Sequence, residues 1–137
     1  MLTNSIYRYR FFLGLELVVV VAVIMIFKVI EDRALAGTIA GMTFLISTAL
    51  VLVLEWIHVK RLTWTIAGGA IFMALSVLPI LIIRSATWGT PFDQAEFLGI
   101  RGAWLHKISN YVFLLFLVGI FISLQKERIR LLRRQQH

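Results

Sequence analysis

Residues 11–30 read FFLGLELVVVVAVIMIFKVI, an apolar run that only one acidic and one basic side chain interrupt. A helix that crosses about 30 Å of hydrocarbon needs roughly 20 mostly apolar residues. The strands of a membrane barrel would alternate polar and apolar residues, which this stretch does not. The stretch is also longer than the apolar part of a removable signal peptide. We therefore expect a retained transmembrane helix.

Three further stretches of the same kind follow along the chain. They cover residues 35–57, 62–83 and about 106–124, and the first two connections are only a few residues long. Short connections make consecutive helices antiparallel neighbours. The sequence thus predicts an all-α integral membrane protein whose residues 1–137 form one four-helix transmembrane bundle.

The composition excludes a soluble domain. Apolar residues make up 60% of the 137 residues and charged residues 15%, with a mean hydropathy of +0.89. A soluble domain is about 45–50% apolar, and a chain of this length could not bury the additional apolar surface away from water. The absence of cysteine also excludes disulfides, thiolate metal sites and cysteine nucleophiles.

The distribution of basic residues predicts the orientation. Four spans place both termini on one side, which would carry nine of the 14 Lys and Arg residues. Because positive charge favours the cytoplasm, we expect an N-in/C-in topology in a bacterial inner membrane. Tryptophan prefers the headgroup level, and the four tryptophans lie at predicted crossing points. They are Trp56, Trp64, Trp88 and Trp104.

The external segment 85–107 separates the third and fourth spans. Thr90 can cap a helix, Pro91 suits its first position, Asp93 suits a capping box, and Gly99 suits its end. We expect a short interfacial helix here. The external segment as a whole would be either a connection that its aromatic side chains anchor to the membrane surface or a lid over a substrate pocket.

The tail, residues 125–137, reads QKERIRLLRRQQH and is expected to continue the fourth helix into the cytoplasm. Each positive charge near the surface attracts anionic lipid headgroups by roughly 1 kcal/mol. The tail is therefore either a membrane anchor or a docking surface for an acidic partner. Nucleic acid is not an expected partner, because no aromatic residues are interleaved. The basic residues are Lys126, Arg128, Arg130, Arg133 and Arg134.

Two glutamates, Glu16 and Glu55, lie within predicted spans, where an ionisable group suggests a function. The antiparallel helices would place both carboxyl groups in the inner leaflet at similar depth. Three roles remain open: an ion pair or snorkelling group that fixes packing, proton or cation coupling, and contact with another subunit. The candidate partners are His58, Lys60, Arg61 and Arg10.

In its four helices and the glutamate of its first helix, Glu16, the chain resembles the small multidrug transporters. Those proteins work as dimers and exchange protons for a cationic substrate. The resemblance implies that Glu16 would bind and release the coupling proton. No other marker of that family is present in the sequence.

Small residues line faces of the second and third spans. Gly37 and Gly41 form a GxxxG pattern, and Gly68 and Gly69 lie in the third span. Such faces let helices approach closely, either within the chain or between chains. Pro79 removes a backbone donor, so we expect a kink there, with Ser76 satisfying the freed carbonyl group of Leu75.

Two histidines are candidate cofactor ligands. His58 and His106 would lie on opposite faces of the membrane, so they cannot bind one haem or metal together. Each could provide one axial ligand of a haem or pigment shared with another subunit. Otherwise no metal site and no cofactor are predicted.

These observations predict a small non-catalytic membrane subunit or assembly factor of a larger membrane complex. No nucleophile–base arrangement, phosphate-binding loop or zinc motif is present, so we do not expect an enzyme. The alternative is an autonomous oligomeric transporter or channel, coupled to protons through Glu16. Either role implies other membrane subunits or further copies of the chain as partners, besides lipid.

Overall fold

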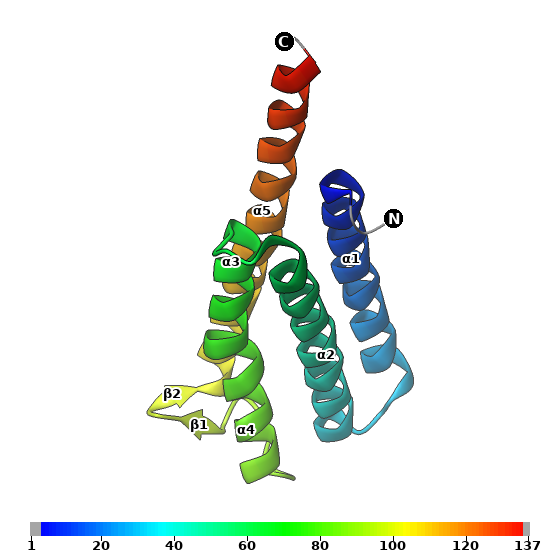
Figure 1. Ribbon diagram of the computed structural model, residues 1–137. Helices are drawn as coiled ribbons and strands as arrows, with labels where there is room; N and C mark the ends of the chain where they lie inside the picture. Colours follow the sequence, from blue (N-terminus) through cyan, green and yellow to red (C-terminus); the bar gives the residue numbers. More distant parts are fainter. Residues whose placement is uncertain (1–3, 136–137) are drawn as a thin grey trace.

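The computed structural model describes residues 4–135, and within them four helices are long and apolar enough to cross a membrane. The first two are α1 (Ser5–Val29) and α2 (Arg33–Val59), and the fourth is α5 (Gly102–Gln135). The third consists of α3 (Trp64–Phe72), the π-helical turn η1 (Met73–Val77) and α4 (Leu78–Ala86). The predicted all-α membrane bundle is confirmed at this level (Figure 1).

Polar caps set the helix ends between the spans. The Asn4 side chain accepts a hydrogen bond from the backbone of Ile6 at the start of α1. Asp32 caps α2 and Thr63 caps α3 in the same way. Lys60 ends α2 in the left-handed conformation, with φ at 49°. Caps satisfy backbone groups that the first helical turn leaves unpaired, so short polar connections suffice between long apolar helices.

The helices form a bundle in which α3 packs along α5, and α1 packs against both α2 and α5. Aromatic side chains of three helices meet in the interior, and Phe72 has ring contacts with Phe44, Phe113 and Phe116. Large apolar side chains such as Val21 and Ile46 point outward and are exposed. An apolar exterior around an apolar core is typical of a bundle surrounded by lipid.

Residues 90–101 form turns and a β-hairpin instead of the predicted interfacial helix. Strand β1 (Glu96–Phe97) pairs antiparallel with β2 (Ile100–Arg101). The two residues between them, Leu98 and Gly99, have φ values of 50° and 79°. Positive φ at both central residues defines the tight hairpin turn, and Gly99 adopts it without strain. The helical start at Pro91 therefore stops after one turn.

The hairpin is fixed to the end of the bundle that lies away from the termini. Ala95 is buried with Ile83 of α4 and Leu105 of α5, and Phe92 and Phe97 pack against this cluster. We call this end of the molecule the loop side. The opposite end, which carries the N-terminus and the end of α5, is the terminal side (Figure 1).

Helix α5 is longer than the predicted fourth span. It begins at Gly102, directly after the hairpin, and continues without interruption to Gln135. The predicted basic tail is thus helical as far as it is described, and its last two residues, Gln136 and His137, lie outside the described residues. In Figure 1 the end of α5 projects beyond the other helices on the terminal side.

Candidate functional site

A buried ion pair joins the beginning of α1 to the end of α2. The guanidinium Nε of Arg8 donates a hydrogen bond to Oε2 of Glu55 at 3.0 Å. The hydroxyl of Tyr9 donates to Oε1 of the same carboxylate at 2.7 Å. All three residues are buried. Both oxygens of Glu55 are therefore hydrogen-bonded, which is what a buried carboxylate requires.

Arg8 was not among the partners that the sequence suggested for Glu55. Arg10, which was suggested, lies two residues further along α1 and is exposed. His58 is also exposed, and its Nδ1 lies 2.7 Å from the carbonyl oxygen of Leu54. The sequence did contain a signal for Arg8 in its helical spacing. Arg8, Phe12 and Glu16 recur every four residues and share one buried face of α1.

Glu16 is the second buried glutamate, and its environment is different. Its side chain is fully buried, and no described residue donates a hydrogen bond to either carboxyl oxygen within hydrogen-bonding geometry. Ser47 of α2 lies beside it, with its hydroxyl bonded to the carbonyl oxygen of Phe44. The adjacent hydroxyl of Thr48 is likewise buried without a partner. Burying such groups unsatisfied is costly.

The two carboxyl groups do not lie at the similar depth expected from the sequence. Glu55 meets Arg8, whereas Glu16 comes eight residues later on α1 and lies beside Ser47, eight residues before Glu55 on α2. At 1.5 Å per residue, eight residues correspond to about 12 Å along a helix axis. Glu16 is thus far deeper in the bundle than Glu55, and the two do not form one site.

The small-residue faces lie against other helices of the same chain. A side chain at Gly41 would come within 2.7 Å of Leu81, and one at Gly37 within 2.6 Å of the Arg84 guanidinium, both on α4. Gly69 faces Leu52 of α2 in the same manner. Gly68 faces the backbone of Phe116 on α5. Close helix approach thus accounts for these glycines within one chain.

Pro79 is buried near the start of α4 and follows η1 by two residues. A π-helical turn changes the backbone hydrogen bonding just before the residue that lacks an N–H group. Ser76 was expected to satisfy the carbonyl group of Leu75, but its hydroxyl bonds to that of Ser109 on α5 at 2.5 Å. Its partner is therefore on another helix.

The two histidines lie at opposite ends of the bundle. Both are exposed, with His58 at the terminal end of α2 and His106 at the loop-side end of α5. Among residues 4–135, no group of three or more His, Asp or Glu side chains is arranged to hold a metal ion. A haem or pigment ligated by His58 or His106 would need its remaining ligands from elsewhere.

A cavity of about 730 Å³ opens on the loop side and is lined by residues from all four spanning helices. Apolar side chains from all four helices, including Val20, Phe44 and Phe113, form most of its wall. Charged and polar groups gather at its loop-side end, and the sequence analysis did not predict that they would lie together. They are Arg84, Asp93, His106 and Lys107.

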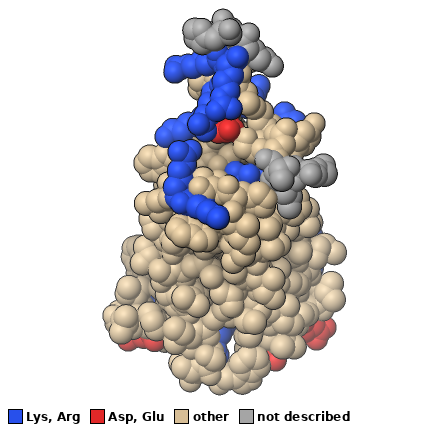
Figure 2. Space-filling view, viewed as in Figure 1, with Lys and Arg blue, Asp and Glu red and all other residues tan. Residues whose placement is uncertain are grey.

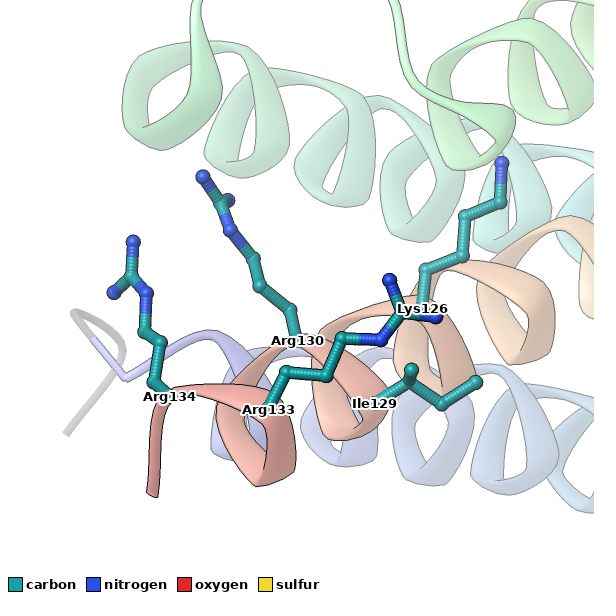
Figure 3. A pocket seen from close by; sticks show the side chains of 5 residues that line it. All are labelled: Lys126, Ile129, Arg130, Arg133 and Arg134. Carbon is teal, nitrogen blue, oxygen red and sulfur yellow. The ribbon is translucent and has the colours of Figure 1, made fainter. Parts of the chain in front are cut away.

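The basic residues of the tail occupy one face of α5. Lys126, Arg130, Arg133 and Arg134 recur at spacings of four, three and one residue, which places them on one side of a helix. They line a shallow groove with Ile129, and Figure 3 shows their side chains together along the last turns of α5. Figure 2 shows basic side chains gathered over this end, with acidic ones mainly at the other.

Arg128 stands apart from this set. It lies two residues from Arg130, which corresponds to a rotation of about 200° around the helix. We use the term basic face for Lys126, Arg130, Arg133 and Arg134. Within it, Arg130 approaches Glu127 at 4.0 Å, and an exposed pair at that distance contributes little.

No protein-family model, curated protein or solved structure matches this chain. The candidate sites therefore rest on their own geometry. They are the Arg8–Tyr9–Glu55 cluster, the isolated Glu16, the loop-side cavity and the basic face.

Proposed function

We propose that the protein is a small non-catalytic integral membrane subunit or assembly factor of a larger membrane complex. The observation that carries this proposal is the basic face of α5, which is exposed and lies beyond the apolar bundle. Most of the other described residues belong to the four helices that are long and apolar enough to span a membrane. A helix that presents four cations on one face is suited to docking against an acidic protein surface.

Distance from the membrane favours a protein partner over lipid for the outer part of this face. The ammonium group of Lys126 lies 5.3 Å from the ring centre of Trp64, and tryptophan prefers the headgroup level. Arg134 follows Lys126 by eight residues, or about 12 Å of helix. Attraction to anionic headgroups falls off within a Debye length, about 8 Å at physiological ionic strength. The proposal therefore puts Lys126 near the lipid headgroups and Arg134 more than one Debye length beyond them, which supports a protein partner for the outer part of the face.

The proposal places the protein in a bacterial inner membrane with both termini in the cytoplasm. It is supported by the positive-inside rule, since the basic face and the Lys60–Arg61 turn lie on the terminal side. The acidic partner would then be a cytoplasmic domain or the cytoplasmic loops of another membrane protein.

Gentle extraction from the native membrane, followed by native mass spectrometry, tests the proposal. We expect a stoichiometric complex with at least one other protein. Reversing two charges of the basic face, in Arg130→Glu/Arg134→Glu, should weaken that complex at least tenfold, because close charge pairs across an interface contribute several kcal/mol.

Arg128→Glu is the matched control, since it changes a charge in the same helix on the other face. It should retain the partner. A chain that purifies without any other protein would contradict the proposal. Equal release by the control and the double variant would instead point to general attraction between the tail and anionic lipid.

A second candidate function is an autonomous oligomeric transporter or channel that is coupled to protons. The specific observation in its favour is Glu16, a buried carboxyl group without a hydrogen-bond partner among the described residues. It predicts a homo-oligomer without other proteins in the same extraction. It also predicts that Glu16→Gln abolishes pH-driven flux in liposomes, whereas the exposed Glu31→Gln does not. Unchanged flux in Glu16→Gln would exclude this function.

A further inference from the structure

The loop-side cavity combines an apolar interior with a positively charged end. Its volume of about 730 Å³ lies within the range of roughly 300–1,000 Å³ that is usual for small-molecule sites. Phe27, Phe44, Phe72 and Phe113 are among the residues that line its length. Midway along, the bonded hydroxyl groups of Ser76 and Ser109 add polar atoms.

Arg84 is held at the charged end by contacts that leave its charge unpaired. Its guanidinium carbon lies 4.3 Å from the ring centre of Phe92, and the same group fills the space beside Gly37. The Nε atom is buried and has no hydrogen-bond partner among the described residues. Burying an unpaired charge is costly, and a guanidinium matches a phosphate with two parallel hydrogen bonds.

The other charged groups at this end add to a positive balance. Lys107 and Arg84 line the cavity with one acidic residue, Asp93, and with His106. Asp93 is exposed, as are Lys107 and His106. Two cations against one carboxylate leave a net attraction for a single negative charge, even with His106 neutral.

We propose that this cavity binds one anionic phospholipid, with its phosphate against Arg84 and one acyl chain in the apolar interior. The bilayer around the bundle supplies such a molecule directly. Ile24 of α1 and Ala103 of α5 line the cavity and are exposed, so it communicates with the lipid-facing surface. The headgroup lies at the loop-side surface, beside the hairpin. This site is separate from the basic face and does not depend on the partner proposed for it.

Native mass spectrometry of the full-length protein after reconstitution tests this proposal. Nanodiscs of phosphatidylglycerol and phosphatidylcholine provide an anionic and a zwitterionic phospholipid with the same acyl chains. We expect one phosphatidylglycerol per chain to survive detergent extraction, with at least a tenfold preference over phosphatidylcholine. Arg84→Gln should remove that preference.

Arg101→Gln is the matched control, because Arg101 is an exposed arginine on the same side, 3.8 Å from Glu96. It should bind like the unaltered protein. Equal retention of phosphatidylglycerol by Arg84→Gln and Arg101→Gln would overturn the proposal. Displacement of the lipid by inorganic phosphate alone would also overturn it, since it would show a simple anion site.

A second pair of variants tests whether an acyl chain occupies the apolar interior of the cavity, and this test holds even if Arg84→Gln does not fold. Val20 lines the cavity, whereas its neighbour Val21 is exposed on the outside of α1. Val20→Phe should reduce lipid retention several-fold, and Val21→Phe should leave it unchanged. Equal retention by the two variants, or occupation of the cavity by a protein cross-linked at residue 20, would contradict the proposal.

Discussion

At the scale of single residues, the two buried glutamates show how position decides the role of one residue type. Glu55 receives hydrogen bonds from Arg8 and Tyr9 and links α1 to α2. Glu16 lies about two helical turns deeper and receives none from the described residues. Glu55 thus joins two helices, whereas Glu16 is the residue on which the alternative proposal of a proton-coupled transporter rests.

Replacing Arg8 by alanine should lower the free energy of unfolding by roughly 3 kcal/mol. The substitution leaves a buried carboxylate without its charge partner, which is strongly destabilising. Arg10→Ala, on the exposed side of the same helix, should change stability by less than about 0.5 kcal/mol. Thermal or chemical unfolding in detergent measures both.

The double variant Arg8→Ala/Glu55→Ala checks the cause. If the two groups interact directly, the double variant should lose much less than the sum of the two single losses. Additive losses would show that each residue acts independently, and would contradict the ion pair as the source of stability.

At the scale of secondary structure elements, glycine determines how closely α3 and α5 can pack. A side chain at Gly119 would lie 2.7 Å from the backbone carbonyl oxygen of Trp64, and one at Gly68 would lie 3.1 Å from Cα of Phe116. Backbone atoms cannot rotate away as a side chain can. The contact between these helices therefore requires small residues.

Gly119→Ala should destabilise the protein by about 1–3 kcal/mol, because the added methyl group forces the helices apart. The control is Gly14→Ala, since a side chain at Gly14 meets nothing within 4 Å. That change should be neutral or stabilise by up to about 1 kcal/mol, because alanine favours the helix. Unfolding measurements should therefore show a loss of stability for Gly119→Ala alone, and equal effects of the two variants would contradict this packing.

At the scale of the whole molecule, the two ends of the bundle differ in shape and charge. The terminal side carries the projecting end of α5 and its basic face, and the loop side carries the hairpin and the cavity (Figures 1 and 2). The basic face and the charged end of the cavity lie at opposite ends of the bundle and are separated along the helix axes. A partner at one end and a lipid at the other can therefore be tested independently.

Labelling with a membrane-impermeant thiol reagent tests the proposed orientation. The sequence contains no cysteine, so only the introduced thiol of this chain can react. Arg61→Cys and Arg128→Cys lie on the terminal side, and Gln94→Cys lies in the loop-side segment; all three positions are exposed. In intact cells we expect Gln94→Cys to react and the other two to react only after permeabilisation. The reverse pattern would show that the termini face outward.

The number of apolar helices long enough to span a membrane and the helical continuation of α5 follow from the sequence. The reason is physical: apolar length against the thickness of hydrocarbon depends on local composition alone. The polar caps and the small-residue faces are local patterns of the same kind. The hairpin departs from this, because the cap signals at Thr90 and Pro91 start a turn, and pairing of Glu96 with Arg101 then competes with a helix.

Tertiary structure alone decided which polar groups meet. The spacing of Arg8, Phe12 and Glu16 places Arg8 and Glu16 on one face of α1, but only the packing of α1 on α2 turns that face toward Glu55. The depth of Glu16 and the gathering of Arg84, His106 and Lys107 around one cavity likewise arise from residues distant in the chain. A helix forms through bonds within itself, whereas a site forms where several helices pack, and only their relative rotation and position determine it.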